Sequence, residues 1–161
     1  MQKELQGVTE LEPNKKPLHL FIGLILLFFG GWAVINGISS ITDSKSRLYT
    51  PNKSIVVEKV DTPELKYLGL SLREELDSNS GMLFVFETTS DKNCLVMRDM
   101  KFSLDMVWLD ENKKVINIAV NVEPESYPES FCPSSPAKYA LEINAGFASE
   151  AEIAPGVSLK F

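Results

Sequence analysis

Two cysteines and one histidine are the only side chains of their kinds in this chain, and their spacing limits the available chemistry. A zinc site usually draws four ligands from Cys and His. Cys94, Cys132 and His19 supply three and lie far apart in the sequence, so we expect neither a metal site nor a cofactor. His19 lies at the N-terminal boundary of a long apolar segment, and without a second histidine the rest of the chain has no Ser-His-Asp or Cys-His nucleophile.

The two cysteines can instead pair with each other. Cys94 and Cys132 both lie in segments of loop-like composition, where a buried free thiol is less expected. A disulfide would tie the start of the Met97 segment to a proline-rich loop, and closing the intervening loop would contribute about 3–4 kcal/mol in the chain-entropy model. The alternative is two buried free thiols, which is typical of a reducing compartment.

Asp105 is the second feature with possible chemistry, because it interrupts an apolar strand pattern over residues 102–109. A lone carboxylate among apolar side chains must find a partner or shift its pKa upward. We expect an arginine partner, Arg73 in preference to Arg98, since a tie between distant segments would explain a buried charge best. Two interpretations stay open. Either Arg73, Arg98, Asp99 and Asp105 converge into a polar pocket that binds a small ligand, or Asp105 only fixes the hairpin by capping backbone N–H groups or pairing with an arginine.

The elements that must position these residues are mostly strands. Alternating or β-branched runs and turn signals predict strands at 54–60, 82–87, 102–109, 115–122, 139–143 and 157–161. Pro63 and Gly69 suit the start and end of a short helix, and a second is expected at 146–153. These elements predict a mainly β fold, a small antiparallel barrel or jelly-roll-like sandwich with one or two short helices at its rim.

The N-terminal part has a different character. Residues 18–42 contain no charged side chain, and this length suffices for a transmembrane helix, which needs roughly 20 apolar residues. We therefore divide the chain into a tail (1–17), a membrane helix (18–42), a linker (43–53) and a β domain (54–161). Gly37-Ile38-Ser39 is a small-x-small sequence, so cleavage after the helix stays open.

Charge bears on partners and orientation. The formal net charge is -6, and the acidic excess lies beyond residue 42. An acidic domain repels phosphate backbones, so we expect no nucleic-acid partner. Lys15 and Lys16 lie close to the apolar segment on its N-terminal side, and a disulfide requires an oxidising compartment. Both favour a β domain outside the cytoplasm, the disulfide more strongly. The total count of Lys and Arg does not favour this orientation, because the other side of the segment carries Lys45, Arg47, Lys53 and Lys59.

The order of several motifs resembles the domain of unknown function 192 family. The resemblance rests on DTPELKYLGLSLREEL, GMLFVFE, MRDMKFSLDMVWLDENKKV and YALEINAG, and it covers residues 54–161. Around Met97 the family pattern is similar to Met-Lys-Asn-Met followed by Pro-Leu-Asp, from which Arg98, Asp99 and Ser103 depart. The resemblance implies an all-β, jelly-roll-like fold in proteins that are often exported and sometimes membrane-anchored, with no established activity.

The sequence thus predicts a single-pass protein of the cell membrane, in contact with the lipid bilayer through residues 18–42. Its extracytoplasmic β domain is expected to bind an unidentified small ligand or an envelope protein. The alternative is a carboxylate-dependent hydrolase using Asp105 or Asp99, and we assign no catalytic residue. An enzyme would need a concave pocket with at least one carboxylate that no arginine neutralises.

Overall fold

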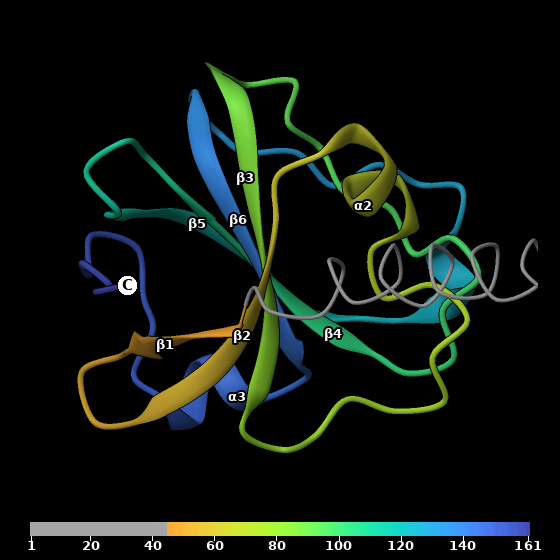
Figure 1. The fold of residues 1–161 in the computed structure, drawn as a ribbon, viewed down its shortest axis with the longest axis horizontal. Helices are drawn as coiled ribbons and strands as arrows, with labels where there is room; N and C mark the ends of the chain where they lie inside the picture. Colours follow the sequence, from red (N-terminus) through yellow and green to blue (C-terminus); the bar gives the residue numbers. More distant parts are fainter. Residues whose placement is uncertain (1–44) are drawn as a thin grey trace, which may run out of the picture. The chain divides into compact units, whose positions relative to one another are not determined.

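Residues 45–161 are described by the computed structural model, and they form a six-stranded sheet with the order β1-β2-β3-β6-β4-β5 (Figure 1). The strands are β1 (Lys45–Tyr49), β2 (Ser54–Val60), β3 (Ser80–Ser90), β4 (Leu104–Leu109), β5 (Val115–Val122) and β6 (Ala137–Asn144). The helices are α2 (Pro63–Leu68), α3 (Phe147–Glu150) and the single 3-10 turn η1 (Pro124–Ser126). A mainly β fold with two short α-helices is therefore confirmed for this part of the chain.

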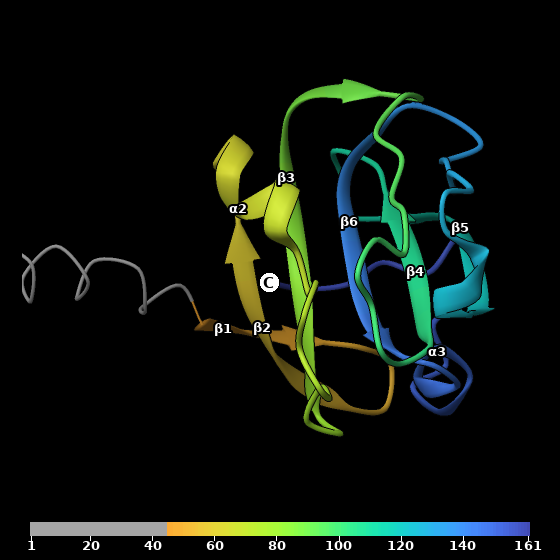
Figure 2. The same ribbon diagram turned by 90° about the vertical axis from the view of Figure 1, so that its right-hand side faces the viewer.

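The sheet is mixed and open, so the expectation of an antiparallel barrel or sandwich is wrong in this respect. β2 pairs with β3 in parallel, whereas the other strand pairs are antiparallel. Parallel strands cannot be joined by a tight hairpin and need a longer connection. Here the connection between β2 and β3 contains α2, which returns the chain to the other end of the sheet. Figure 2 shows the strong twist of the sheet, with β1-β2-β3 on one side and β6-β4-β5 on the other.

The two edges of the sheet differ from the sequence expectation. The C-terminal residues expected to form a strand make only isolated bridges, Lys114 to Ser158 and Tyr49 to Lys160. The structure places β1 within the segment that we expected to be a linker. Within β1 only Leu48 is buried, so the sequence there lacks the alternation that marks a strand.

The short helix predicted to begin at Pro63 and end at Gly69 is confirmed, and so are the two strands that form the β4–β5 hairpin. The Thr62 hydroxyl accepts a hydrogen bond from Leu65 N at 3.3 Å, and Gly69 follows the helix with a φ of 52°. In the hairpin, Asp110 Oδ1 accepts from the backbone of Asn112 and Lys114 at 2.8 and 2.9 Å. A side chain that satisfies two turn amides explains why the chain reverses there.

Both faces of the sheet are buried, each under a different cover. One face packs against α3 and the C-terminal segment, with Leu83, Val107 and Leu141 in its core. The other face carries Met82, Met106 and Trp108 and is covered by α2 and the segment 94–102. Neighbouring residues of a strand point to opposite faces. Since both faces are covered, every residue of β4 is buried.

The predicted disulfide is confirmed. Cys94 and Cys132 are joined with an S–S distance of 2.05 Å and a Cα–Cα distance of 4.1 Å. Next to it, Leu95 and Phe131 exchange two backbone hydrogen bonds of 2.8 and 2.9 Å. The segment that begins at Cys94 is thus attached to the proline-rich loop, as expected.

The predicted membrane helix at 18–42 lies outside the described residues. Within residues 45–161, no helix is both long enough and apolar enough to span a bilayer.

Candidate functional site

Asp105 is held by backbone amides and not by an arginine. Its side chain is 1% exposed. Oδ1 accepts a hydrogen bond from Asn121 N at 2.9 Å, and Oδ2 accepts one from Ala148 N at 3.0 Å. The predicted pairing with Arg73 or Arg98 is therefore wrong, and the capping alternative describes this residue. Asn121 has a φ of 48°, a left-handed conformation that turns its N–H toward the carboxylate.

Arg73 pairs with a different carboxylate. Its two terminal nitrogens donate to the Glu58 oxygens at 2.7 and 2.8 Å, in a bidentate ion pair that is about one-third exposed. The hydrogen bonds from Arg73 lower the pKa of Glu58, and the same bonds raise the pKa of Arg73. Since Glu58 satisfies the guanidinium, Arg73 has no need of Asp105.

Arg98 and Asp99 lie at a third place, next to α2. The guanidinium of Arg98 stacks over the Tyr67 ring, 3.7 Å from its centroid, and donates to the Tyr67 carbonyl. Asp99 is a largely exposed neighbour, with Oδ2 3.9 Å from Arg98 Nε. The expected pocket of Arg73, Arg98, Asp99 and Asp105 is therefore not assembled. Asp105 lies on the α3 face of the sheet, whereas Arg98 lies on the α2 face.

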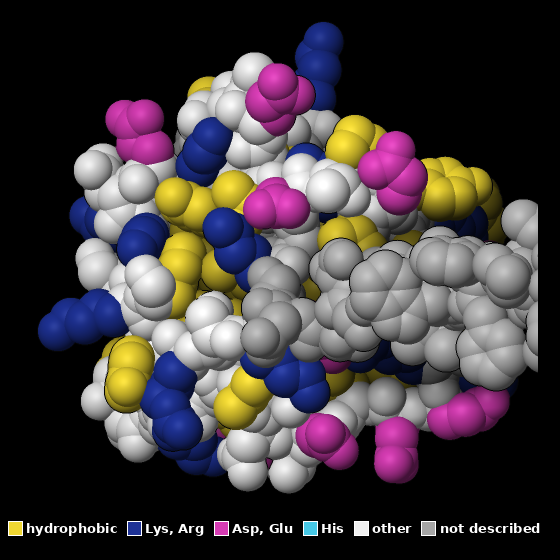
Figure 3. All heavy atoms as spheres, viewed as in Figure 1, with side chains coloured by type: hydrophobic (Ala, Val, Ile, Leu, Met, Phe, Trp, Pro, Cys, Tyr) yellow, Lys and Arg dark blue, Asp and Glu magenta, His cyan; other side chains and the backbone are white. Residues whose placement is uncertain are grey.

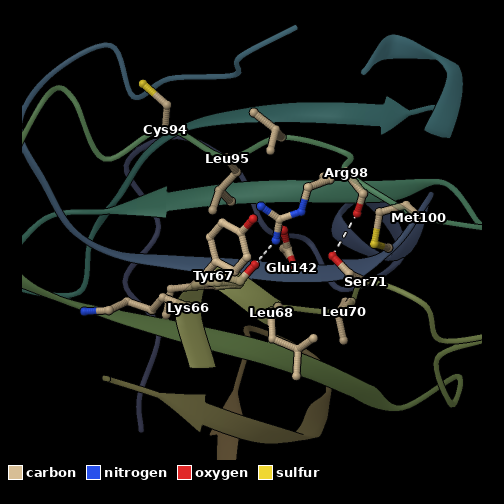
Figure 4. Close-up of a pocket in the computed structure, with 13 residues that line it drawn as sticks. Lys66, Tyr67, Leu68, Leu70, Ser71, Cys94, Leu95, Arg98, Met100 and Glu142 are labelled. Atoms are coloured by element: carbon tan, nitrogen blue, oxygen red, sulfur yellow. Dashed lines mark hydrogen bonds between the residues drawn. The ribbon is translucent and has the colours of Figure 1, made fainter. Parts of the chain in front are cut away.

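A cavity of about 200 Å³ opens on the α2 face, between that helix and the segment 94–100 (Figure 4). Its walls are largely apolar. They include Leu68, Leu70, Phe84, Leu95, Val96 and Met100. Arg98 adds positive charge, whereas the Nζ of Lys66 is directed to the Val85 carbonyl at 3.1 Å, and Glu142 on β6 provides the single acidic side chain of the lining. The cavity is thus an apolar pocket with a few polar groups, which is the usual composition of a small-ligand site.

Glu142 has no partner among residues 45–161. Its side chain is 5% exposed, and none of the hydrogen bonds or ion pairs in this part of the chain involves its carboxyl group. No described polar side-chain atom is both sealed from solvent and without a partner. The Glu142 oxygens therefore reach the cavity, where a ligand or water can contact them.

Burial changes the acidity of this group. Desolvation raises the pKa of Glu142 to about 8, although the charge of Arg73 acts in the opposite direction. The cause is that a low-dielectric site disfavours the charged form. At neutral pH Glu142 is therefore mostly a neutral carboxylic acid, which can donate one hydrogen bond as well as accept others.

The sequence contained a signal for Glu142 that we did not use. It lies between Leu141 and Ile143, both fully buried, so it interrupts an apolar strand as Asp105 does. The rule that a lone carboxylate among apolar residues needs a partner applies to both positions. The apolar strand pattern alone does not show which of the two carboxyl groups already has hydrogen-bond partners.

The chemistry of the site is limited by its single acid. No group of three or more His, Cys, Asp or Glu side chains that could hold a metal is present in residues 45–161. Hydrolysis by paired carboxylates needs two such groups about 5–9.5 Å apart, and the lining contains one. What the arrangement can do is bind: one neutral acid, a fixed cation and apolar walls.

Comparisons with known proteins give a family and a fold. A family model described as "Uncharacterized ACR", the domain of unknown function 192, matches residues 46–161. No curated protein matches the chain.

Two crystal structures are similar over the same region. One is of a proposed transcription regulator from Sinorhizobium meliloti 1021, with 28% identity, a TM-score of 0.65, and 71% of this chain and 89% of that chain covered. The other is of a protein of unknown function from Novosphingobium aromaticivorans DSM 12444, with 28% identity, a TM-score of 0.64, and 73% and 84% covered.

Proposed function

This chain belongs to the domain of unknown function 192 family, and we propose that it is a membrane-anchored, extracytoplasmic binding module that holds a small ligand in the Glu142 cavity. The observation that carries the proposal is the buried carboxyl of Glu142, which has no partner in residues 45–161. Because its oxygens are open to the cavity, a ligand can form a hydrogen bond with this carboxyl group that no side chain of residues 45–161 makes.

The anchored, extracytoplasmic location has separate support. Residues 18–42 form an uncharged segment of sufficient length, and the Cys94–Cys132 disulfide is typical of an oxidising compartment. Protease added to intact spheroplasts should digest the β domain while a cytoplasmic marker survives. A domain that is digested only after lysis would overturn this orientation.

The hydrolase alternative moves from Asp105 and Asp99 to Glu142. A carboxylic acid with a raised pKa is suited to general-acid catalysis, and no ion pair within residues 45–161 neutralises Glu142. The cavity offers no second carboxylate to activate water or attack a substrate. A binding function therefore fits the lining better.

A nucleic-acid function, which the description of the Sinorhizobium relative would suggest, has little support in this chain. The net charge is -6. On the face in Figure 3, Lys and Arg side chains are interspersed with acidic and hydrophobic ones. Phosphate binding needs a continuous basic surface.

The binding function is tested with three probes of one shape and different charge: benzoate, benzamide and benzylamine. NMR spectra of the full chain in detergent micelles should show shifts at the amides of Gly69 and Leu95 with at least one probe. Val96→Trp places a large side chain at the cavity and should abolish the shifts. Val120→Trp, at an exposed position on β5, is the matched control. If no probe shifts the cavity amides, the proposed function is wrong.

A further inference from the structure

We propose that the ligand of this cavity is a small organic carboxylate with an apolar body, whose head group accepts a hydrogen bond from Glu142 and is attracted by Arg98. The inference rests on the binding function proposed above and adds the ligand class. It follows from three features of the lining: an unpartnered buried acid, a preorganised cation and apolar walls.

The charge balance of the cavity favours an anion. Arg98 and Glu142 are its charged head groups, because the Nζ of Lys66 points away from both (Figure 4) and donates to the Val85 carbonyl at 3.1 Å. Glu142 is the single acid of the lining. Because desolvation raises the pKa of Glu142 to about 8, this acid carries little charge at neutral pH and the site is positive. A cationic ligand would have to ionise Glu142 while lying near the guanidinium of Arg98.

Glu142 also has the right hydrogen-bonding form for a carboxylate. A protonated carboxyl group donates one O–H bond, and a bond from a neutral acid to an ionised acceptor is stronger than a bond between neutral groups. Ionised Glu142 would be an acceptor only and would repel a bound anion. Binding of a carboxylate therefore requires the proton on Glu142.

Arg98 is fixed in place before any ligand arrives. Its guanidinium stacks on the Tyr67 ring and donates to the Tyr67 carbonyl, and its own backbone carbonyl accepts from Ser71 Oγ at 2.8 Å (Figure 4). A guanidinium has five N–H donors, so several are left for an anion. The side chain is 24% exposed, which reduces the screening of its charge by water.

The walls set the size and polarity of the ligand body. Phe84, Leu70 and Leu95 contribute apolar surface. The cavity of about 200 Å³ is smaller than the roughly 300–1,000 Å³ of sites for drug-sized ligands. A small carboxylate with an aliphatic or aromatic body fits these limits better than a phosphate ester, whose second negative charge would need more donors.

The other charged groups near Glu142 do not supply the same pH response. Glu142 is aligned across the sheet with Met82 of β3 and Met106 of β4, and Met82 is aligned with Glu58 of β2. Glu58 is held ionised by Arg73, with the pKa of Glu58 lowered and that of Arg73 raised. From the cavity side, Tyr67 and Arg98 face Glu142 (Figure 4), whereas the Nζ of Lys66 donates to the Val85 carbonyl.

The test measures affinity by calorimetry, using the full chain in detergent micelles at about pH 6.5 and about pH 9.5. At the lower pH benzoate should bind at least tenfold more tightly than benzamide or benzylamine. Its affinity should fall about 30-fold at the higher pH, because only the protonated site binds it. Equal affinity for benzamide, or tighter binding of benzylamine at high pH, would overturn the ligand class while the binding function stands. Binding of none of the three would overturn both.

Two variants separate the roles of the acid and the cation. Glu142→Gln keeps a donor but cannot ionise, so benzoate binding should persist and lose its pH dependence. Arg98→Met should weaken benzoate about tenfold at both pH values, and Arg98→Lys should recover part of that loss. Glu150→Gln, at an exposed position, is the control for a lost carboxylate. A Glu142→Gln protein that keeps the 30-fold pH response would show that another group is responsible and would contradict the proposal.

Discussion

Asp105 and Glu142 are two buried carboxylates on neighbouring strands, and only one of them has partners. In the β4–β6 pairing, Asp105 is aligned with Ile143 and Glu142 with Met106, so the two acids are one position apart and point to opposite faces. Asp105 accepts two backbone hydrogen bonds at 2.9 and 3.0 Å. Glu142 accepts none from residues 45–161 and faces a cavity.

The difference separates a structural role from a binding role. A buried acid with satisfied oxygens joins the segments that donate to it, here β5 and α3 to β4. A buried acid whose oxygens open into a cavity and have no partner in residues 45–161 is free to contact an external ligand. Four predictions test this distinction, from the largest expected effect to the smallest.

Asp105→Ala should have the largest effect on stability. It leaves the N–H groups of Asn121 and Ala148 buried without an acceptor, at a cost of about 1–3 kcal/mol each, so the free energy of unfolding should fall by about 4 kcal/mol. Urea unfolding measures it. Asp105→Asn retains an acceptor oxygen and should lose about half as much. A loss below about 1 kcal/mol in the alanine variant would contradict a structural role.

Removing the disulfide should come next. Cys94→Ala with Cys132→Ala should lower the free energy of unfolding by about 3 kcal/mol, because the unfolded chain gains freedom when the loop is opened. Cys94 lines the cavity, so hydrogen exchange should increase at Leu95 more than at Ala148. An equal increase at both amides would show that the cavity wall does not depend on this bond.

The pH dependence of stability should report Glu142. Its pKa is raised from 4.5 to about 8 in the folded state, so between these values the folded chain holds a proton that the unfolded chain has lost. The contribution of Glu142 to stability therefore falls as pH rises through this window, by up to about 1.4 kcal/mol per pH unit, and is level outside it. The stability difference between wild type and Glu142→Gln at each pH measures the slope. A difference that does not change with pH would contradict the raised pKa.

Arg73→Met should have the smallest effect. The Arg73–Glu58 pair is about one-third exposed, so solvent screening limits its contribution to about 1 kcal/mol or less. Because Arg73 does not contact Asp105, its effect should add to that of Asp105→Ala within about 0.5 kcal/mol. Strong coupling in the double variant would restore the arginine pairing that the sequence suggested.

Local patterns predicted much of the fold. The helix between Pro63 and Gly69, the strands at 102–109 and 115–122 and the Cys94–Cys132 bond each depend on nearby residues or on a choice between few partners, and the structure contains them. The parallel β2–β3 pair and the edge strand β1 were missed. Strand pairing is decided by contacts between distant segments, and β1 buries only Leu48.

The site was harder to predict than the fold. The apolar strand pattern identified Asp105 as a buried acid but gave the wrong partner. Its partners are backbone N–H groups, and every residue type except proline can supply one, so the sequence does not reveal them. Arg73 was satisfied by Glu58, a carboxylate on a strand whose alternation we did read. Glu142 interrupts its apolar strand as Asp105 does, but only the structure shows that it faces a cavity and has no partner in residues 45–161.

The most direct test is an NMR titration of the Glu142 side-chain carboxyl carbon, with Glu142→Gln used to assign the resonance. The central claim is that this acid is buried, unpartnered and open to a ligand. It predicts a midpoint near pH 8 in the free protein, where desolvation holds the pKa, and a higher midpoint in the presence of benzoate. A midpoint near the ordinary value of 4.5 that benzoate leaves unchanged would contradict the claim.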